Sequence, residues 1–187
     1  MPMAGCHKSR GKYIITGVVI MAFKEIGAKE INDNLIKMIA DEWMLICAGN
    51  EEKFNMMTAS WGFTGEIWGK DYAVALVRPQ RYTDEFMKSN ENFALCFLGD
   101  NKKPHAVCGH SSGRDVDKTK LTGLKPVFSD GCVYFEQARL VIICKKTYVS
   151  KLDKECFLDP SIIEKNYPNG DFHNVYFGEI QKVLVNE

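Results

Sequence analysis

Short apolar runs that end at turn-forming residues are the feature that most restricts the fold of this 187-residue chain. Runs of this length, rich in β-branched and aromatic residues, are typical of strands rather than helices. They do not alternate with long helical segments, so a parallel sheet with crossover helices is not expected. The pattern favours a mainly β chain with short helices, folded as a small antiparallel barrel. The expected strands cover residues 43–49, 55–62, 72–77, 92–98, 132–148 and 175–185.

The run at 132–148 is long for a single strand, and its apolar and polar residues alternate only in part. From Leu140 to Cys144 it is apolar throughout. A strand that changes the side it presents in this way predicts a bulge and a bend, which are common in closed barrels.

Three short helices are expected between the strands. One covers residues 32–40 with Asn32 or Asp33 as its cap, one runs from Thr83, as its cap, to residue 89, and one covers 116–122, capped by Asp115 and stopped by Gly123. Residues 100–114 and 156–171 are expected to be irregular because they contain proline and glycine.

The composition excludes several classes of function. The chain is long enough for one domain with a core, and its 24 basic and 24 acidic residues give no basic excess for nucleic acid or a membrane surface. Seven cysteines, an odd number without C-x-x-C spacing, predict reduced thiols in the core of a cytoplasmic protein. The four histidines show no paired metal-ligand spacing. Motifs for a Rossmann site, a phosphate-binding P-loop or a G-x-S-x-G hydrolase are absent from the sequence.

The N-terminal residues differ in character from the rest. A basic start at 7–12 precedes an apolar run at 13–23, as in a signal peptide, but no small-residue cleavage site precedes Lys24. The run is too short to span a bilayer as a helix. It is either a strand of the barrel or partly upstream of a natural start at Met21. We expect residues 1–20 to be a flexible or non-native extension, and residues 21–187 to form one domain.

Residues 53–83 hold the strongest chemical signal. Hydroxyl and small residues stand at one end of the apolar run at 72–77, and Arg78, Arg81 and Thr83 crowd a turn at the other. Hydroxyls and backbone donors suit the polar edge of a flat ring, and guanidinium groups suit an anionic tail. This stretch therefore predicts a ligand that has both.

This stretch also resembles the flavin reductase-like family of FMN-binding split barrels, which includes flavoredoxins. Three sets of residues, in order along the chain, are similar to that family and together cover roughly 22–185. They are Asn55-Met56-Met57-Thr58-Ala59-Ser60-Trp61-Gly62 with Val77-Arg78-Pro79-Gln80-Arg81-Tyr82-Thr83, then Cys108-Gly109 with Ser112-Gly113-Arg114-Asp115-Val116-Asp117-Lys118, and then Phe157-Leu158-Asp159-Pro160-Ser161, Asn166-Tyr167-Pro168 and Tyr176 with Gly178-Glu179-Ile180.

The resemblance implies a six-stranded antiparallel Greek-key split barrel that binds FMN near the interface of a homodimer. It also implies NADH or NADPH as the reductant and a small-molecule or protein electron acceptor. Neither nucleic acid nor a membrane is an expected partner.

Candidate FMN-binding residues follow from the resemblance together with their chemistry. Arg81 and Thr83 are the main candidates for the phosphate, with Tyr82, Pro79 and Arg78 beside them, although Arg78 could pair with a surface acid and Arg81 could be a solvated turn residue. For the ring, small residues let the backbone approach, while Met57 and Trp61 could equally be core and Thr58 and Ser60 turn-stabilising. The ring candidates are Asn55, Met57, Thr58, Ala59, Ser60 and Trp61.

A second polar loop supplies the remaining candidates, Ser112, Gly113, Arg114 and Lys118. It departs from the family pattern, because the segment before it is short and His110 stands where a hydroxyl residue is usual. The loop could therefore contact the FMN of its own subunit or that of the dimer mate.

Three functions remain open from the sequence. The chain could be an FMN-dependent NAD(P)H oxidoreductase, a flavoredoxin-like electron carrier without nicotinamide activity of its own, or a split barrel for another ligand such as haem. In the first two, no side chain acts as a covalent nucleophile, because the cofactor carries the redox chemistry.

Overall fold

The computed structural model describes residues 8–9, 12–15, 18–21 and 23–186. Near the N-terminus, β1 (Lys8–Ser9), β2 (Lys12–Ile15) and β3 (Val18–Met21) pair antiparallel in a small sheet of their own. The expected extension at 1–20 lies partly outside the described residues, and its boundary with a domain at 21–187 stays a prediction.

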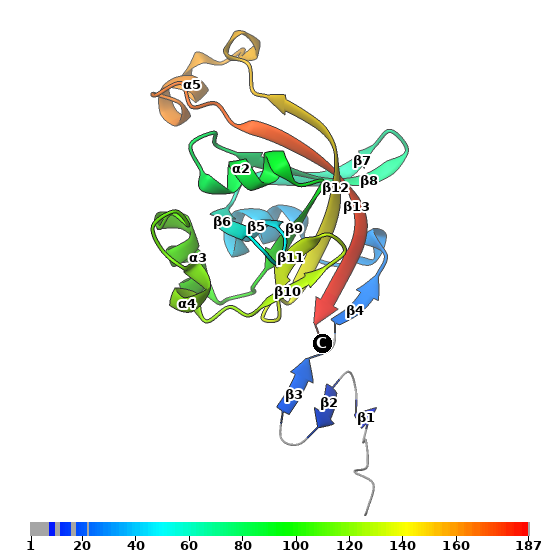
Figure 1. Cartoon of the computed structure of the whole chain (residues 1–187). Helices are drawn as coiled ribbons and strands as arrows, with labels where there is room; N and C mark the ends of the chain where they lie inside the picture. Colours follow the sequence, from blue (N-terminus) through cyan, green and yellow to red (C-terminus); the bar gives the residue numbers. More distant parts are fainter. Residues whose placement is uncertain (1–7, 10–11, 16–17, 22, 187) are drawn as a thin grey trace, which may run out of the picture.

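The main sheet confirms the expected mainly β, antiparallel architecture (Figure 1). Its strands pair in the order β6-β5-β9-β12-β13-β8-β7, and β4 pairs with the end of β13. The described sheet has eight strands rather than six. The sequence did not predict β4 and β7, because neither segment contains a continuous apolar run. The strands are β4 (Phe23–Ile26), β5 (Met44–Gly49), β6 (Phe54–Ala59), β7 (Gly62–Ile67), β8 (Lys70–Val77), β9 (Asn92–Phe97), β12 (Leu140–Lys151) and β13 (Asn174–Asn186).

The two outer strands of this order, β6 and β7, are consecutive in the sequence. Only Ser60 and Trp61 connect them. Two residues span less than about 10 Å, so the sheet must curl until its two edges meet at this connection. The edges are not paired with each other in the described sheet, which leaves the barrel split at this point.

Side chains on both faces of the sheet are buried. Along β5, Met44 and Ile46 join one core cluster with Phe86 of α2 (Tyr82–Ser89), whereas Leu45 and Cys47 join a second cluster on the opposite face. The hairpin of β10 (Pro126–Ser129) and β11 (Cys132–Phe135) covers that second face. Alternate residues of a strand point to opposite faces, so burial on both sides explains the apolar runs without alternation.

The predicted irregularity in the long strand is confirmed. The register of β12 against β13 shifts between Ile143 and Cys144 and again between Lys146 and Tyr148. The expected single run at 132–148 is in fact two strands, β11 and β12, separated by a turn at residues 136–139.

The predicted caps were wrong by a few residues. The first helical segment consists of α1 (Leu35–Lys37) and the π-helix η2 (Met38–Glu42), and its cap is Asn34, whose side chain accepts from the Lys37 amide at 3.0 Å. In α2 the cap position is occupied by Arg81. The hydroxyl of Thr83 is turned inward and accepts a hydrogen bond from Asn55 Nδ2 at 2.9 Å.

Two segments expected to be irregular contain helices. Residues 102–110 form α3 (Lys102–His110), and residues 160–166 form α5 (Pro160–Asn166). In both helices the proline stands in the first turn, where the missing N–H costs no intrahelical hydrogen bond. The helix α4 (Lys118–Thr122) is capped by Asp117 rather than Asp115, and Gly123, with φ of 73°, ends it as predicted. The 3-10 turns η1 (Ala28–Glu30) and η3 (Lys154–Cys156) complete the elements.

The six described cysteines form no disulfide with one another, and all but Cys156 are buried, as expected for core thiols. None of the described helices has the length and apolar character that crossing a membrane requires.

Gly178 provides a test of the packing between β13 and its neighbours. A Cβ atom there would lie 2.5 Å from both Cys144 Cβ and the Phe93 ring, whereas a Cβ at Gly65 of β7 would meet nothing within 4 Å. We expect Gly178→Ala to lower the free energy of unfolding by about 1–3 kcal/mol through overpacking. Gly65→Ala serves as the matched control and should change it by less than about 1 kcal/mol. Equal urea midpoints for the two variants would contradict the described packing.

Candidate functional site

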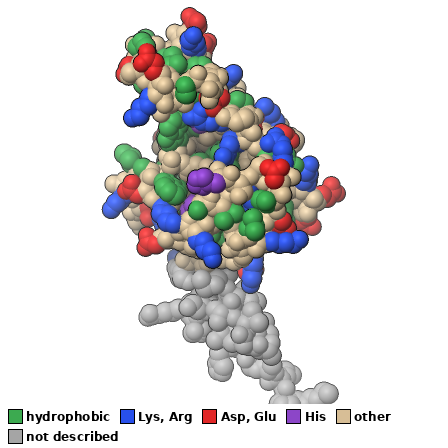
Figure 2. Space-filling model, turned by 90° about the vertical axis from the view of Figure 1, so that its left-hand side faces the viewer, with side chains coloured by type: hydrophobic (Ala, Val, Ile, Leu, Met, Phe, Trp, Pro, Cys, Tyr) green, Lys and Arg blue, Asp and Glu red, His purple; other side chains and the backbone are tan. Residues whose placement is uncertain are grey.

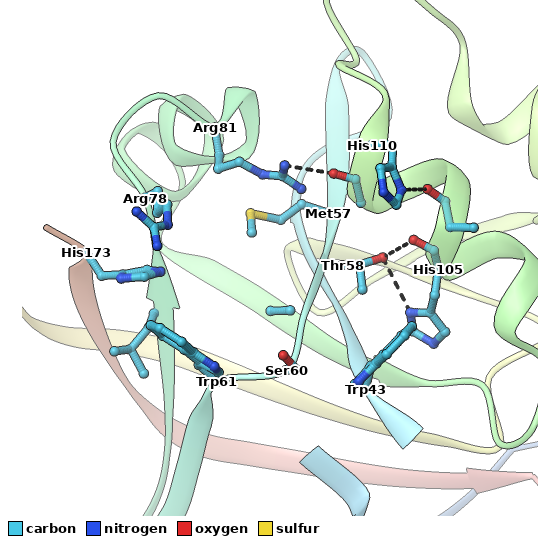
Figure 3. Close-up of a pocket in the computed structure, with 14 residues that line it drawn as sticks. Trp43, Met57, Thr58, Ser60, Trp61, Arg78, Arg81, His105, His110 and His173 are labelled. Atoms are coloured by element: carbon cyan, nitrogen blue, oxygen red, sulfur yellow. Dashed lines mark hydrogen bonds between the residues drawn. The ribbon is translucent and has the colours of Figure 1, made fainter. Parts of the chain in front are cut away.

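A cavity of about 470 Å³ opens where the barrel is split. The space-filling view in Figure 2 shows a hollow on this side of the molecule, and Figure 3 shows the side chains around it. Its wall combines the end of β6 and the connection to β7 with α3, the end of β8 and the residue before β13. The lining residues are Trp43, Met57, Thr58, Ala59, Ser60, Trp61, Leu76, Arg78, Arg81, His105, Ala106, Gly109, His110 and His173.

Seven of the fifteen residues predicted from the sequence line this cavity. They are Met57, Thr58, Ala59, Ser60, Trp61, Arg78 and Arg81. The others, Asn55, Pro79, Tyr82, Thr83, Ser112, Gly113, Arg114 and Lys118, lie outside its wall. The structure therefore brings most of the ring candidates and both arginines to one wall, and it places the second polar loop outside that wall.

The connection between β6 and β7 presents free backbone groups to the cavity. Neither the Ser60 nor the Trp61 amide has a backbone acceptor within the described part of the chain. Edge strands and their connections expose such groups because no neighbouring strand pairs with them. A planar ligand lying here would meet amide donors along its edge.

Aromatic side chains form two sides of the cavity. On one side the Trp61 and His173 rings pack with centroids 5.1 Å apart, and on the other Trp43 meets His105 edge to face at 6.0 Å. Thr58 lies between them on β6, and its hydroxyl donates to the His105 carbonyl at 2.7 Å (Figure 3). Flat apolar walls with a few polar groups are typical of sites for planar ligands.

The charge of Arg78 is compensated within the protein. Its guanidinium pairs with Asp171 and donates to the Asn166 carbonyl at 2.8 Å. Hydrogen bonds from Gln80 and Arg78 hold the pKa of the Asp171 carboxyl below its usual value. Arg78 thus pairs with an acid, the alternative that the sequence left open, while its side chain still lines the cavity.

Arg81 differs because it has no acidic partner among the described residues. Its guanidinium donates to the carbonyls of Gly109, at 2.8 Å, and Cys108, at 3.3 Å, at the C-terminal end of α3. Burial lowers the pKa of Arg81, and the nearby charge of Arg78 adds to this effect. Carbonyl dipoles orient this cation without neutralising it.

Lys118 is a second buried cation close to Arg81. Its side chain is 5% exposed, and its ammonium donates to the carbonyls of Met56 at 2.7 Å and Cys108 at 3.3 Å. Burial is the main cause of its lowered pKa, to which the charge of Arg81 also contributes. The two cations share the Cys108 carbonyl, and neither has a carboxylate partner in the described ranges, so this region favours an anion.

The remaining predicted residues form the outer side of this cationic region. Gly113 packs so closely on Asn55 that any Cβ would clash with the amide oxygen, and the Asn55 amide is bonded to Thr83. Arg114 lies over the Tyr82 ring at 4.5 Å and pairs with Glu85. These contacts hold the second polar loop against α2 and β6. Pro79 belongs to the turn before α2, and the Ser112 hydroxyl accepts from the Arg114 amide at 3.2 Å.

Seven lining residues were not predicted from the sequence: Trp43, Leu76, His105, Ala106, Gly109, His110 and His173. Four of them lie on α3, in a segment that was expected from the sequence to be irregular. Gly109 and His110 lie in the second motif and His173 lies near the C-terminal motif, so these three stood near a signal that could have found them.

The family model described as flavin reductase-like domain matches residues 37–187, which is most of the chain. The chain belongs to the flavin reductase-like family. No match was found among curated proteins.

Solved structures share the split-barrel fold. A flavoredoxin from Methanosarcina acetivorans is 20% identical with a TM-score of 0.60, and the match covers 87% of this chain and 77% of that one. An FMN-binding domain of a flavin reductase-like enzyme from Shewanella baltica is 11% identical with a TM-score of 0.63, covering 90% and 80%. An NADH:FAD oxidoreductase from Streptomyces globisporus, in complex with NAD and FAD fragments, is 14% identical with a TM-score of 0.56, covering 76% and 73%.

The two buried histidines of this family member make its stability depend on pH. Burial lowers the pKa of His105 and of His173 to about 4, with the charges of Lys102 and Arg78, respectively, as the next cause. In the unfolded chain both return to about 6.5. Below that pH the unfolded state binds protons that the folded state does not, so the free energy of unfolding should fall from pH 6.5 towards 4.

Urea unfolding at several pH values measures this dependence. His173→Asn should flatten the slope between pH 4 and 6.5, whatever its effect on stability at pH 7. If NMR titration of the wild type gave both imidazoles a pKa near 6.5, the described burial of these side chains would be wrong.

Proposed function

We propose that this protein binds FMN in the cavity at the split of the barrel and acts as an NAD(P)H-dependent flavoprotein oxidoreductase. The observation that carries the proposal is the pair of buried cations, Arg81 and Lys118, that share the Cys108 carbonyl without a carboxylate partner in the described structure. Burying uncompensated charge is costly, and a bound phosphate would offset that cost.

The other residues of the cavity also fit FMN. Its volume of about 470 Å³ lies in the range of small-molecule sites. The phosphate would be held by Arg81, with Lys118, Thr83 and the first turn of α2 close to it. The ring would lie along Thr58, Ala59 and Ser60, where free amides reach its polar edge and the aromatic side chains limit access of water. FMN bound in this way supplies the hydride-accepting chemistry.

Nicotinamide binding is supported by the open side of the cavity. A hydride donor that stacks on an exposed flavin ring needs no Rossmann domain, which agrees with the absence of its glycine motif from the sequence. The likeness to an NADH:FAD oxidoreductase supports the same reading through the fold. NADH and NADPH are both candidate reductants, and the acceptor is a small molecule or a protein.

A second candidate function is that of an electron carrier that holds FMN without nicotinamide activity of its own. The fold shared with flavoredoxins supports this candidate. Its site would contain the same cavity and cations, so kinetics must separate it from the first.

We further propose a homodimer. An exposed aromatic cluster of Phe63, Trp68 and Tyr148, beside the unpaired edge of β7, supports association through this side of the barrel. Sedimentation equilibrium should give the mass of two chains.

The buried cysteines of the described residues form no disulfide with one another, which supports a cytoplasmic location.

The proposed activity is tested by anaerobic stopped-flow absorbance. After addition of FMN and removal of the unbound cofactor, the protein should show the spectrum of bound flavin. NADH or NADPH should bleach this spectrum within seconds. Bleaching by neither donor would contradict the reductase and leave the electron carrier. A protein that gives no flavin spectrum even with added FMN would contradict both and point to another ligand, such as haem.

A further inference from the structure

The backbone of Trp43, one of the cavity residues that the sequence did not reveal, has an unusual conformation. Its φ is 69° and its ψ is 167°, a region that only glycine adopts readily. A non-glycine residue held there costs on the order of 1–3 kcal/mol. Such strain persists only where the surrounding structure enforces it, and it occurs most often at binding sites.

The segment before Trp43 enforces this conformation. Residues 38–42 form the π-helix η2, and the Trp43 amide closes it by donating to the Met38 carbonyl at 3.1 Å. Single π-turns are rare in proteins, and those that occur are often found at functional sites. From Met44 onward the chain belongs to β5, which is paired on both sides by β6 and β9, so the change of direction falls at Trp43.

Lys102 of α3 fixes the indole from one side. Its ammonium lies 4.3 Å from the centroid of the Trp43 ring and donates to the carbonyls of Asp41 and Glu42, the latter at 2.7 Å. One cation thereby holds both the end of the π-helix and the ring that follows it.

The indole also borders the main cavity. Trp43 is among the residues that line that cavity, and Lys102 is not. Lys102 instead lines a separate, smaller cavity of about 240 Å³ together with Asp41 and Glu42. Lys102 thus contacts the indole without lining the main cavity, and Figure 3 shows Trp61 across the connection from Trp43.

We propose that Trp43 is a ring-binding residue of this site, whose indole packs against the isoalloxazine ring of the bound flavin and is positioned by Lys102. The inference rests on the proposed binding of FMN. It explains why a strained backbone is kept at residue 43: the strain places a flat aromatic surface on the wall opposite Trp61. An indole against a flavin ring contributes stacking energy and quenches flavin fluorescence by electron transfer.

Three substitutions of Trp43 separate the ring from the backbone strain. Trp43→Ala keeps the strained position but loses the indole, whereas Trp43→Gly loses the indole and relieves the strain. Both should weaken FMN binding by a factor of about 10, the effect of losing one stacked aromatic ring, while Trp43→Gly should have the higher urea midpoint of the two. Trp43→Phe should keep affinity within about threefold, because a flat ring remains.

Fluorescence of bound FMN gives a readout that does not depend on activity. At saturating FMN, the Trp43→Phe complex should be brighter than the wild-type complex, since phenylalanine is a poor electron donor. Lys102→Met should also raise the fluorescence by releasing the indole, and the exposed neighbour Lys103→Met should not. Trp61→Phe measures the part of the quenching that belongs to the opposite wall.

The outcomes separate this inference from the proposed function. If the wild type binds no FMN, the proposed function itself fails. If it binds FMN, and Trp43→Ala and Trp43→Gly bind it as tightly and leave it as dim as the wild type does, Trp43 does not contact the ring and the inference is wrong. Equal urea midpoints for the Ala and Gly variants would contradict the claim that the backbone is strained.

Discussion

The two-residue connection between β6 and β7 determines how the sheet closes and where its cavity opens. It joins the two outer strands of the sheet, so the sheet has to curl until its edges meet. The same connection leaves backbone amides at Ser60 and Trp61 without backbone acceptors in the described part of the chain. Closure of the fold and exposure of a binding edge therefore have one cause, and the cavity lies where the two edges meet.

The described charges favour one orientation for an anionic ligand in this cavity. Arg78 is paired with Asp171 and contributes little net charge, whereas Arg81 and Lys118 are bonded only to carbonyls. Their carbonyl partners come from α3 and β6, so the helix and the edge strand fix the cationic end. The described side chains favour a ligand with an anionic group at that end and a flat ring between the aromatic walls. FMN has both parts, and it is the ligand proposed for this member of the flavin reductase-like family.

Features that depend on a local pattern of residues could be predicted from the sequence. The strands with apolar runs, the bulge in β12 and the glycine stop after α4 follow from pattern alone, and Met57 to Trp61 with Arg81 were found because they form one compact motif. Strands β4 and β7 could not be predicted, because their residues are too polar to form an apolar run.

Other features depend on contacts between distant segments. Pro104 suggested a loop, but in the first turn of α3 it is compatible with a helix, and four cavity residues were missed as a result. Thr83 has the chemistry of a cap, yet its hydroxyl bonds to Asn55, 28 residues earlier in the chain. Trp43 gave no signal at all, since its conformation results from the π-helix before it and from Lys102 of α3.

Binding of the FMN phosphate by Arg81 can be tested by a thermodynamic cycle. Titration calorimetry would compare FMN with riboflavin, which lacks the phosphate, in the wild type and in Arg81→Ala. If Arg81 binds the phosphate, the substitution should cost FMN about 1.5–3 kcal/mol of binding free energy, the worth of a charge-assisted contact, and should cost riboflavin almost nothing. An equal loss for both ligands, or no loss for FMN, would contradict it.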